Sequence, residues 1–231
     1  MSTPPEDEDV PSPIDLCDAS DAREWAETAL VKRPWRTQFF ESFSDELRAL
    51  DASNLDVLEL GSGPGFLAEY LLARHSEIAR YTLLDFSPPM LAMARERLGA
   101  SRHRVDEVLA DFKSDAEWPR LLPSRPNVIM SMQAVHELRH KRHARRLYEQ
   151  LFAILPDAGT LLVCDHLSRS GDPRSELLFM NEEEQVAALR SAGFVDVEVR
   201  RVLSGMALGA IARVTGPRNS ETCSPPEVRK A

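Results

Sequence analysis

Two histidines with acidic neighbours are the side chains best suited to proton transfer. His136 precedes Glu137 in the segment Met130-Ser-Met-Gln-Ala-Val-His-Glu-Leu138, and His166 follows Asp165. An imidazole titrates near neutral pH, so a positioned histidine can act as a general base that a carboxylate orients. His136 and His166 are therefore the candidate catalytic residues. The alternatives are that His136 caps or packs beneath a following helix and that Asp165 caps a turn.

A glycine-rich loop follows an apolar segment and precedes a helical one. It is Leu58-Glu-Leu-Gly-Ser-Gly-Pro-Gly-Phe66, with Gly61, Gly63 and Gly65 in the spacing G-x-G-x-G. Glycines at a strand-to-helix turn allow tight backbone geometry and close approach to a ligand. Dinucleotide-binding loops have the spacing G-x-G-x-x-G, and Phe66 stands where their third glycine would be. The loop favours a bound ligand other than a dinucleotide.

An acidic residue lies about 20 residues beyond this loop, at the spacing found in nucleotide-binding folds. Asp85 ends the apolar part of Tyr81-Thr-Leu-Leu-Asp-Phe-Ser-Pro-Pro-Met90. At the end of a second parallel strand, an acid can accept hydrogen bonds from both hydroxyls of a ribose. The glycine loop alone is also compatible with a turn that binds nothing, and the acid favours a nucleoside-containing ligand.

Both segments resemble the sequence motifs of one enzyme family. Glu59-Leu-Gly-Ser-Gly-Pro-Gly65 is similar to motif I of the class I S-adenosylmethionine-dependent methyltransferases, and the residues from Asp85 to Met90 resemble the segment after the ribose-binding acid. The resemblance covers about residues 55 to 214. It implies a methyltransferase with S-adenosylmethionine as its cofactor. Before the fifth strand, the family's Lys-Pro-Gly-Gly turn is replaced by Leu155-Pro-Asp-Ala-Gly159, a change that affects packing more than chemistry.

The resemblance also implies which residues bind the cofactor. Glu59 would face the methionine moiety, Asp85 the ribose, and Asp111 with Phe112 the adenine. Asp111 is equally compatible with a helix cap, and Met90 with a place in the core. The full implied set is Glu59, Gly61, Ser62, Gly63, Gly65, Asp85, Phe86, Met90, Asp111, Phe112 and Met132.

The segment after the fourth strand lines the methionine and acceptor side in this family, which would place His136 near the methyl acceptor. A sulfonium is already activated, so the protein must chiefly align the acceptor and exclude water. A hydroxyl or protonated amine acceptor additionally needs a base. The family's Asn/Asp-Pro-Pro-Tyr motif for base amines is replaced by Gln133-Ala-Val-His136. We expect transfer to oxygen or nitrogen of a small molecule.

Three other functions stay open at this point. An RNA or protein methyltransferase would share the cofactor site. A non-catalytic protein that retains S-adenosylmethionine as a ligand would have the same motifs. A nicotinamide oxidoreductase is disfavoured by the glycine spacing and by the order of the final strands.

Composition narrows the partners and the compartment. The 231 residues carry a net charge of -9, which disfavours broad charge-driven binding to nucleic acid or an anionic membrane. The three cysteines, Cys17, Cys164 and Cys223, have neither metal-site nor disulfide-framework spacing, so we expect no metal and a reducing cytoplasm. No basic and apolar leader and no membrane-length apolar stretch is apparent. The oligomeric state is not predicted.

The elements that must position these residues follow from the apolar pattern. Short apolar segments alternate with amphipathic ones, which is typical of βαβ units. The predicted strands are Asp56–Leu60, Tyr81–Leu84, Glu107–Ala110, Asn127–Met132, Thr160–Cys164, Val195–Val202 and Ala207–Val214. The predicted helices between them are Pro64–His75, Pro88–Leu98, Lys141–Leu155 and Glu182–Ala192. We predict an α/β, Rossmann-like, doubly wound seven-stranded sheet of order 3-2-1-4-5-7-6 with the last strand antiparallel.

The chain ends are predicted to differ from this central domain, residues 51–214. Residues 1–20 and 215–231 are rich in Pro, Ser and charge and are expected to be mobile tails. Residues 21–50 are expected to form an N-terminal helical cap, with a break at Pro34, that closes the pocket. The basic run from Arg139 to Arg146 is predicted to be a solvated helix face.

Overall fold

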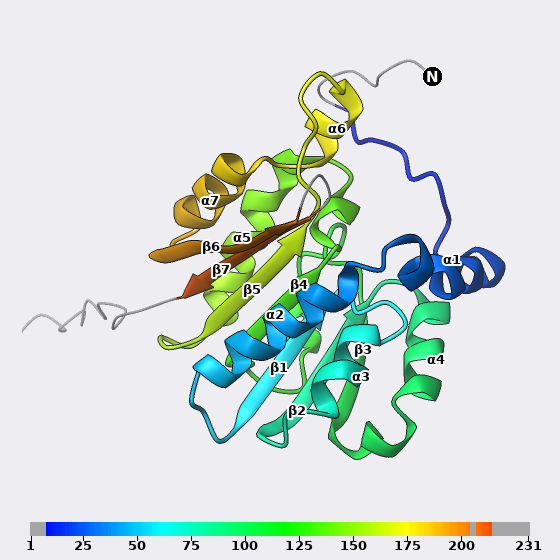
Figure 1. The fold of residues 1–231 in the computed structure, drawn as a ribbon, viewed down its shortest axis with the longest axis vertical. Helices are drawn as coiled ribbons and strands as arrows, with labels where there is room; N and C mark the ends of the chain where they lie inside the picture. Colours follow the sequence, from blue (N-terminus) through cyan, green and yellow to red (C-terminus); the bar gives the residue numbers. More distant parts are fainter. Residues whose placement is uncertain (1–7, 204–206, 214–231) are drawn as a thin grey trace, which may run out of the picture.

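The computed structural model describes residues 8–203 and 207–213, and these form one twisted sheet with helices on both faces (Figure 1). The strands are β1 (Leu55–Leu60), β2 (Ile78–Asp85), β3 (Val105–Leu109), β4 (Val128–Met132), β5 (Thr160–Asp165), β6 (Asp196–Leu203) and β7 (Ala207–Arg213). They lie in the order β3-β2-β1-β4-β5-β7-β6. Strands β1 to β5 pair in parallel, and β7 pairs antiparallel with both β5 and β6. The predicted α/β class with a central parallel sheet is confirmed.

The helices divide between the two faces of the sheet. They are α1 (Ala19–Lys32), α2 (Arg36–Ala49), α3 (Phe66–Leu72), α4 (Pro88–Arg97), α5 (Ala144–Ile154), α6 (Pro173–Leu178) and α7 (Glu182–Ser191). Helices α2, α3 and α4 share one apolar core with the sheet, and α5 and α7 share the other. Because both faces are covered, every residue of β4 and β5 is buried, as expected for the central strands of a parallel sheet.

The order of the strands determines where a ligand can bind. The connection from β1 leads to β2 on one side, whereas β4 lies on the other side of β1. In open α/β sheets, a crevice forms at the carboxyl ends of the strands where the order reverses. The glycine loop after β1, Asp85 at the end of β2 and Gln133 after β4 are therefore adjacent in space.

The N-terminal part of the chain contains the two predicted helices, separated at Pro34. Asp18 caps α1 by accepting hydrogen bonds from the backbone of Ser20 and Asp21, and α2 packs its phenylalanines against the sheet. Residues 1–7 and 214–231 lie outside the described residues. Residues 8–18, expected to belong to a mobile tail, instead lie along the domain as an N-terminal strap, with Val10 fully buried. Contacts of Asp9, Val10 and Pro11 at its beginning, and a hydrogen bond from the Ser87 hydroxyl to the carbonyl of Leu16 at its end, explain the difference.

Within residues 8–203 and 207–213, no helix combines the length and the apolar character that crossing a bilayer requires.

Candidate active site

An inner hollow lies at the carboxyl ends of β1, β2 and β4, and it brings most of the predicted site residues together. Those that line it are Glu59, Gly61, Ser62, Gly63, Asp85, Phe86, Met90, Phe112, Met132, His136 and His166. The strap adds Leu16 to the wall, and the N-terminal cap adds Trp25, Arg33, Arg36 and Phe40. The side chains therefore come from the sheet edge and from the segment before β1.

Asp85 is nearly buried at the bottom of this hollow, with 4% of its surface exposed. The backbone N–H of Gly63 donates to its Oδ2 at 2.7 Å, and the N–H of Ser87 donates to Oδ1 at 2.9 Å. Burial raises the pKa of Asp85 to about 6, although these backbone hydrogen bonds oppose the shift. Each carboxylate oxygen keeps a second acceptor lone pair for a ligand.

The glycine loop approaches the end of β4 more closely than a side chain would allow. At Gly61, φ is +63°, and an added Cβ would lie 2.2 Å from the Cβ of Ala134. The hydroxyl of Ser62 is buried in the same loop and has no hydrogen-bond partner within the described part of the chain. A buried polar atom without a partner in the wall of a hollow is what a polar ligand would satisfy.

Two predicted cofactor residues lie outside the lining of the hollow. Gly65 is the residue just before α3, with φ at +78°. Its backbone packs so closely against α4 that an added Cβ would lie 3.1 Å from the Cβ of Ala94. The Asp111 carboxylate accepts hydrogen bonds from the N–H of Lys113 and the hydroxyl of Ser114, at 2.9 and 2.7 Å. In this structure, Gly65 joins two helices and Asp111 closes a turn.

Glu59 lines the hollow from the end of β1 and is 2% exposed. Its Oε2 accepts a hydrogen bond from the hydroxyl of Tyr81 at 2.7 Å. Burial raises the pKa of Glu59 to about 8, although the Tyr81 hydrogen bond opposes the rise. At neutral pH this carboxyl is therefore mainly protonated, and a cation bound beside it would favour its ionised form.

The two candidate catalytic histidines differ in their surroundings, and Asp165 forms an ion pair with His136. His136 Nδ1 lies 2.6 Å from Asp165 Oδ1, and its Nε2 lies 3.3 Å from Glu137 Oε1. Burial alone would lower the pKa of His136, but the two carboxylates outweigh burial and raise it to about 9. The free protein therefore holds this imidazole in its charged form at neutral pH.

His166 is part of a second chain of polar contacts. Its Nε2 lies 3.0 Å from the Nε2 of Gln133, and the Oε1 of Gln133 accepts a hydrogen bond from the Nε of Arg36. Gln133 has a positive φ of 57°, a conformation that costs a non-glycine residue about 1–2 kcal/mol. From the sequence, the basic segment Lys32–Arg36 is interpreted as a lid over the pocket or as packing around Trp35. The contact of Arg36 with Gln133 has no local sequence signal, because it joins α2 to the loop after β4.

An outer hollow adjoins the inner one on the side of the histidines. The two share the walls formed by Trp25, Arg33, His136, Glu137 and His166. The ring of Phe179, just after α6, lies 5.5 Å from that of His136 and 5.3 Å from that of His166, between ring centroids. The strap lines the outer hollow with residues 12–14. The histidines therefore stand where the two hollows meet.

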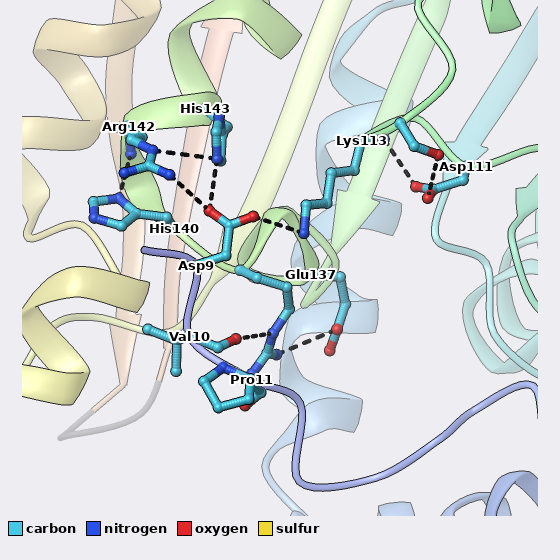
Figure 2. A network of polar contacts seen from close by, with 11 residues as sticks. Asp9, Val10, Pro11, Asp111, Lys113, Glu137, His140, Arg142 and His143 are labelled. Atoms are coloured by element: carbon cyan, nitrogen blue, oxygen red, sulfur yellow. Dashed lines mark hydrogen bonds and ion pairs between the residues drawn. The ribbon is translucent and has the colours of Figure 1, made fainter. Parts of the chain in front are cut away.

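The N-terminal strap is held in place near Glu137, the neighbour of His136 in sequence (Figure 2). Arg139 donates from Nε to the carbonyl of Val10 and from Nη2 to that of Pro11, both at 2.9 Å, and contacts Glu137 at 3.3 Å. These contacts bury Arg139, so the basic run that begins there is only partly the solvated face that its charge predicts.

The beginning of the strap is fixed by one carboxylate. Asp9 contacts Lys113 at 2.9 Å, His143 at 2.8 Å and Arg142 at 3.1 Å (Figure 2). Its small burial would raise the pKa of Asp9, but the contacts with Lys113 and His143 outweigh burial and lower the pKa to about 2. Asp9 is therefore charged at every pH at which the protein is expected to work.

Comparison with known proteins identifies the domain. A family model described as "Methyltransferase domain" matches residues 57–159. The chain is 30% identical over 130 residues to highly reducing polyketide synthase 40 of Fusarium pseudograminearum, covering 54% of this chain and 5% of that protein. It is 32% identical over 139 residues to trans-aconitate 2-methyltransferase of Paracidovorax citrulli, covering 56% of this chain and 49% of that protein. The chain thus matches only a small part of the first relative and about half of the second.

Solved structures support the same fold. An O-methyltransferase family protein from Burkholderia thailandensis has a TM-score of 0.69 and 19% identity, over 87% of this chain and 62% of that one. At this identity, the likeness concerns the fold.

Proposed function

This chain belongs to the class I S-adenosylmethionine-dependent methyltransferase family, and we propose that it transfers a methyl group to a small molecule whose attacking atom must first lose a proton. The pairing of His136 with Asp165 at the junction of the two hollows carries the proposal. The predicted family is confirmed, while the acceptor is the part that we propose.

The inner hollow suits S-adenosylmethionine. Asp85 can accept hydrogen bonds from the ribose hydroxyls, and Ser62 offers a buried hydroxyl without a partner in the described chain. Phe86, Met90 and Phe112 line the hollow and are suited to contact the adenine. Glu59 is placed to balance the positive charge of the methionine moiety. When bound, the cofactor supplies an activated methyl group.

His136 is the proposed general base. Asp165 accepts hydrogen bonds from both the backbone N–H and the Nδ1 of His136, which fixes the ring. Proton transfer would then occur at Nε2, which contacts Glu137 Oε1 at 3.3 Å in the free protein. The pKa near 9 means that the imidazole must lose its proton before it can act. A positively charged cofactor in the same hollow would lower that pKa and favour the neutral base. His166 is proposed to contact the acceptor from the opposite wall.

The acceptor is proposed to enter through the outer hollow and to be a small molecule bearing a hydroxyl or an acidic C–H or N–H group. A base is needed for such groups, whereas a carboxylate acceptor is already deprotonated at neutral pH. The aromatic ring of Phe179 and the strap would exclude water from the junction. A protein or RNA acceptor, or ligand binding without catalysis, remains an outcome of the test below.

The test has two stages. First, calorimetric titration of S-adenosylhomocysteine into the full chain should show binding; a folded protein that binds none would refute the proposal. Second, the protein is incubated with methyl-labelled S-adenosylmethionine and separate pools of metabolites, RNA and proteins. Label in the metabolite pool supports a small-molecule acceptor, label in another pool contradicts it, and binding without transfer to any pool indicates a non-catalytic protein.

A further inference from the structure

Arg36 is a buried cation that lacks an acidic partner. It is 6% exposed and lies at the start of α2, in the wall of the inner hollow. Its guanidinium stands 4.9 Å from the centroid of the Trp25 ring, and its Nε donates to Gln133. Within the described residues, no carboxylate forms an ion pair with Arg36, and the nearby Asp165 is paired with His136. Burying a charge without an opposite charge is costly, so Arg36 requires an explanation.

A second arginine increases this cost. Arg33 lines both the inner and the outer hollow, and no described carboxylate forms an ion pair with it. Burial, and then the positive charge of Arg33, lower the pKa of Arg36 to about 10. Two neighbouring cations that repel each other in a concave site would be stabilised together by one anion.

The unused donors of Arg36 indicate the kind of anion. Gln133 occupies Nε, and neither Nη1 nor Nη2 forms a hydrogen bond with a described residue. A guanidinium presents its remaining N–H groups as a planar fork that matches a carboxylate. The same hollow contains the acids Glu59, Asp85 and Glu137, which would repel a doubly charged phosphate more than a singly charged carboxylate.

We propose that Arg36, with Arg33 beside it, is a carboxylate-binding site at the junction of the two hollows, an inference that rests on the proposed function. Two molecules that meet there can present this group. One is the methionine moiety of the cofactor, whose α-carboxylate would reach Arg36 from the inner hollow. The other is an acceptor that bears a carboxylate and enters by the outer hollow past Arg33.

The first arm of the test compares ligands that differ by one carboxylate. Calorimetry measures S-adenosylmethionine and decarboxylated S-adenosylmethionine on wild type, Arg36→Met and Arg36→Lys. If the cofactor presents the carboxylate, Arg36→Met should weaken S-adenosylmethionine binding about 10- to 100-fold and leave the decarboxylated ligand unchanged. Arg36→Lys should show an intermediate loss, because it keeps the charge without the planar fork. Arg120→Met, at a well-exposed arginine outside both hollows, is the control.

The second arm tests the acceptor. 4-Hydroxybenzoate, which bears one carboxylate and one hydroxyl, is titrated into protein saturated with S-adenosylhomocysteine. If the acceptor presents the carboxylate, Arg36→Met and Arg33→Gln should abolish 4-hydroxybenzoate binding while S-adenosylmethionine binds both variants as it binds wild type.

Thermal unfolding of the free variants distinguishes a binding role from a structural one. Because Arg36→Met removes a buried charge, its melting temperature should be at least that of wild type. A lower melting temperature with equal losses for both cofactor ligands would overturn the proposal. Unchanged affinity for all three probes would overturn it as well. If wild type itself binds no S-adenosylmethionine, it is the proposed function that fails.

Discussion

The two halves of the site are built in different ways. The cofactor half, around the ends of β1 and β2, consists of a continuous glycine loop with the acids Glu59 and Asp85, and its backbone geometry follows largely from the glycines. The acceptor half, around the ends of β4 and β5, joins side chains from four separate segments through the contacts of His136, Gln133, Arg36 and the strap. Local sequence can specify the first half, whereas only the folded chain assembles the second.

If the halves are separable, removing the base should stop transfer without affecting cofactor binding. We expect His136→Ala to lower kcat by about 10²–10⁴-fold, the usual contribution of a general base. Its affinity for S-adenosylhomocysteine should stay within a few-fold of wild type. Transfer of labelled methyl and calorimetry measure the two quantities, with His103→Ala as the control at an exposed histidine. A comparable loss of cofactor affinity would show that the halves are one unit.

A substitution in the cofactor half should instead weaken cofactor binding. Asp85→Ala removes the proposed ribose acceptor, so S-adenosylhomocysteine should bind about 100-fold more weakly. Calorimetry on this variant and on Asp45→Ala, at an exposed acid of α2, measures the effect. Equal affinity for the two variants would place the ribose elsewhere.

The pH dependence of kcat/KM should report on the ionisation of His136, in the acceptor half of the site. Because the proposed base must be neutral and its pKa in the free protein is about 9, kcat/KM should rise with pH and level off above about pH 9. In Asp165→Asn, one carboxylate that raises this pKa is absent, so the rise should occur at lower pH, with a lower plateau because the ring is less well oriented. A profile that is flat from pH 6 to pH 10 would exclude His136 as the base.

Release of a proton when S-adenosylmethionine binds should report on Glu59, in the cofactor half of the site. With a pKa of about 8, Glu59 is mostly protonated at pH 7, and the cationic cofactor should lower that pKa and expel up to about one proton. The binding enthalpy of S-adenosylmethionine at pH 7 should therefore depend on the ionisation enthalpy of the buffer. Glu59→Gln should remove most of this dependence. A buffer dependence that persists in the variant would assign the proton to another group.

The smallest expected effect concerns the strap, which contacts both halves. Asp9→Ala removes three partly exposed ion pairs, each of modest strength, and should raise the Kd of S-adenosylhomocysteine about 2- to 5-fold. Glu8→Ala, at an exposed neighbour, is the matched variant. Equal affinities would mean that the strap does not influence cofactor binding.

The contrast also explains which parts of the site could be predicted from sequence. The glycine loop and Asp85 were found because their spacing is local and the chemistry of a ribose demands an acid there. From sequence, Asp165 is interpreted either as orienting His166 or as capping a turn, whereas its pairing with His136 has no local signal. That pairing arises because β4 and β5 are adjacent parallel strands, with Met132 opposite Cys164. The partner of Asp165 is therefore determined by the pairing of β4 with β5 and not by proximity in the sequence.

Other features carried only a weak sequence signal. The basic segment Lys32–Arg36 is interpreted from sequence as a lid or as packing around Trp35, but the burial of Arg36 depends on how α2 packs. The strap was expected to be mobile because its composition is polar and proline-rich, yet its carbonyls and Asp9 are bound by Arg139 and by the basic residues around His143. Residues 1–7 and 215–231, also expected to be mobile, lie outside the described residues.

Because the N-terminal cap forms part of the wall of both hollows, the central segment alone does not contain the whole site. The segment shared with the methyltransferase family ends before Asp165 and begins after Arg36. It therefore contains the glycine loop, Asp85 and His136, but neither Asp165, which pairs with His136 Nδ1, nor the buried Arg36. Excised or transplanted by itself, it would be an incomplete module. Two proteins that share this module could thus differ in what they methylate, because the flanking segments form much of the acceptor half.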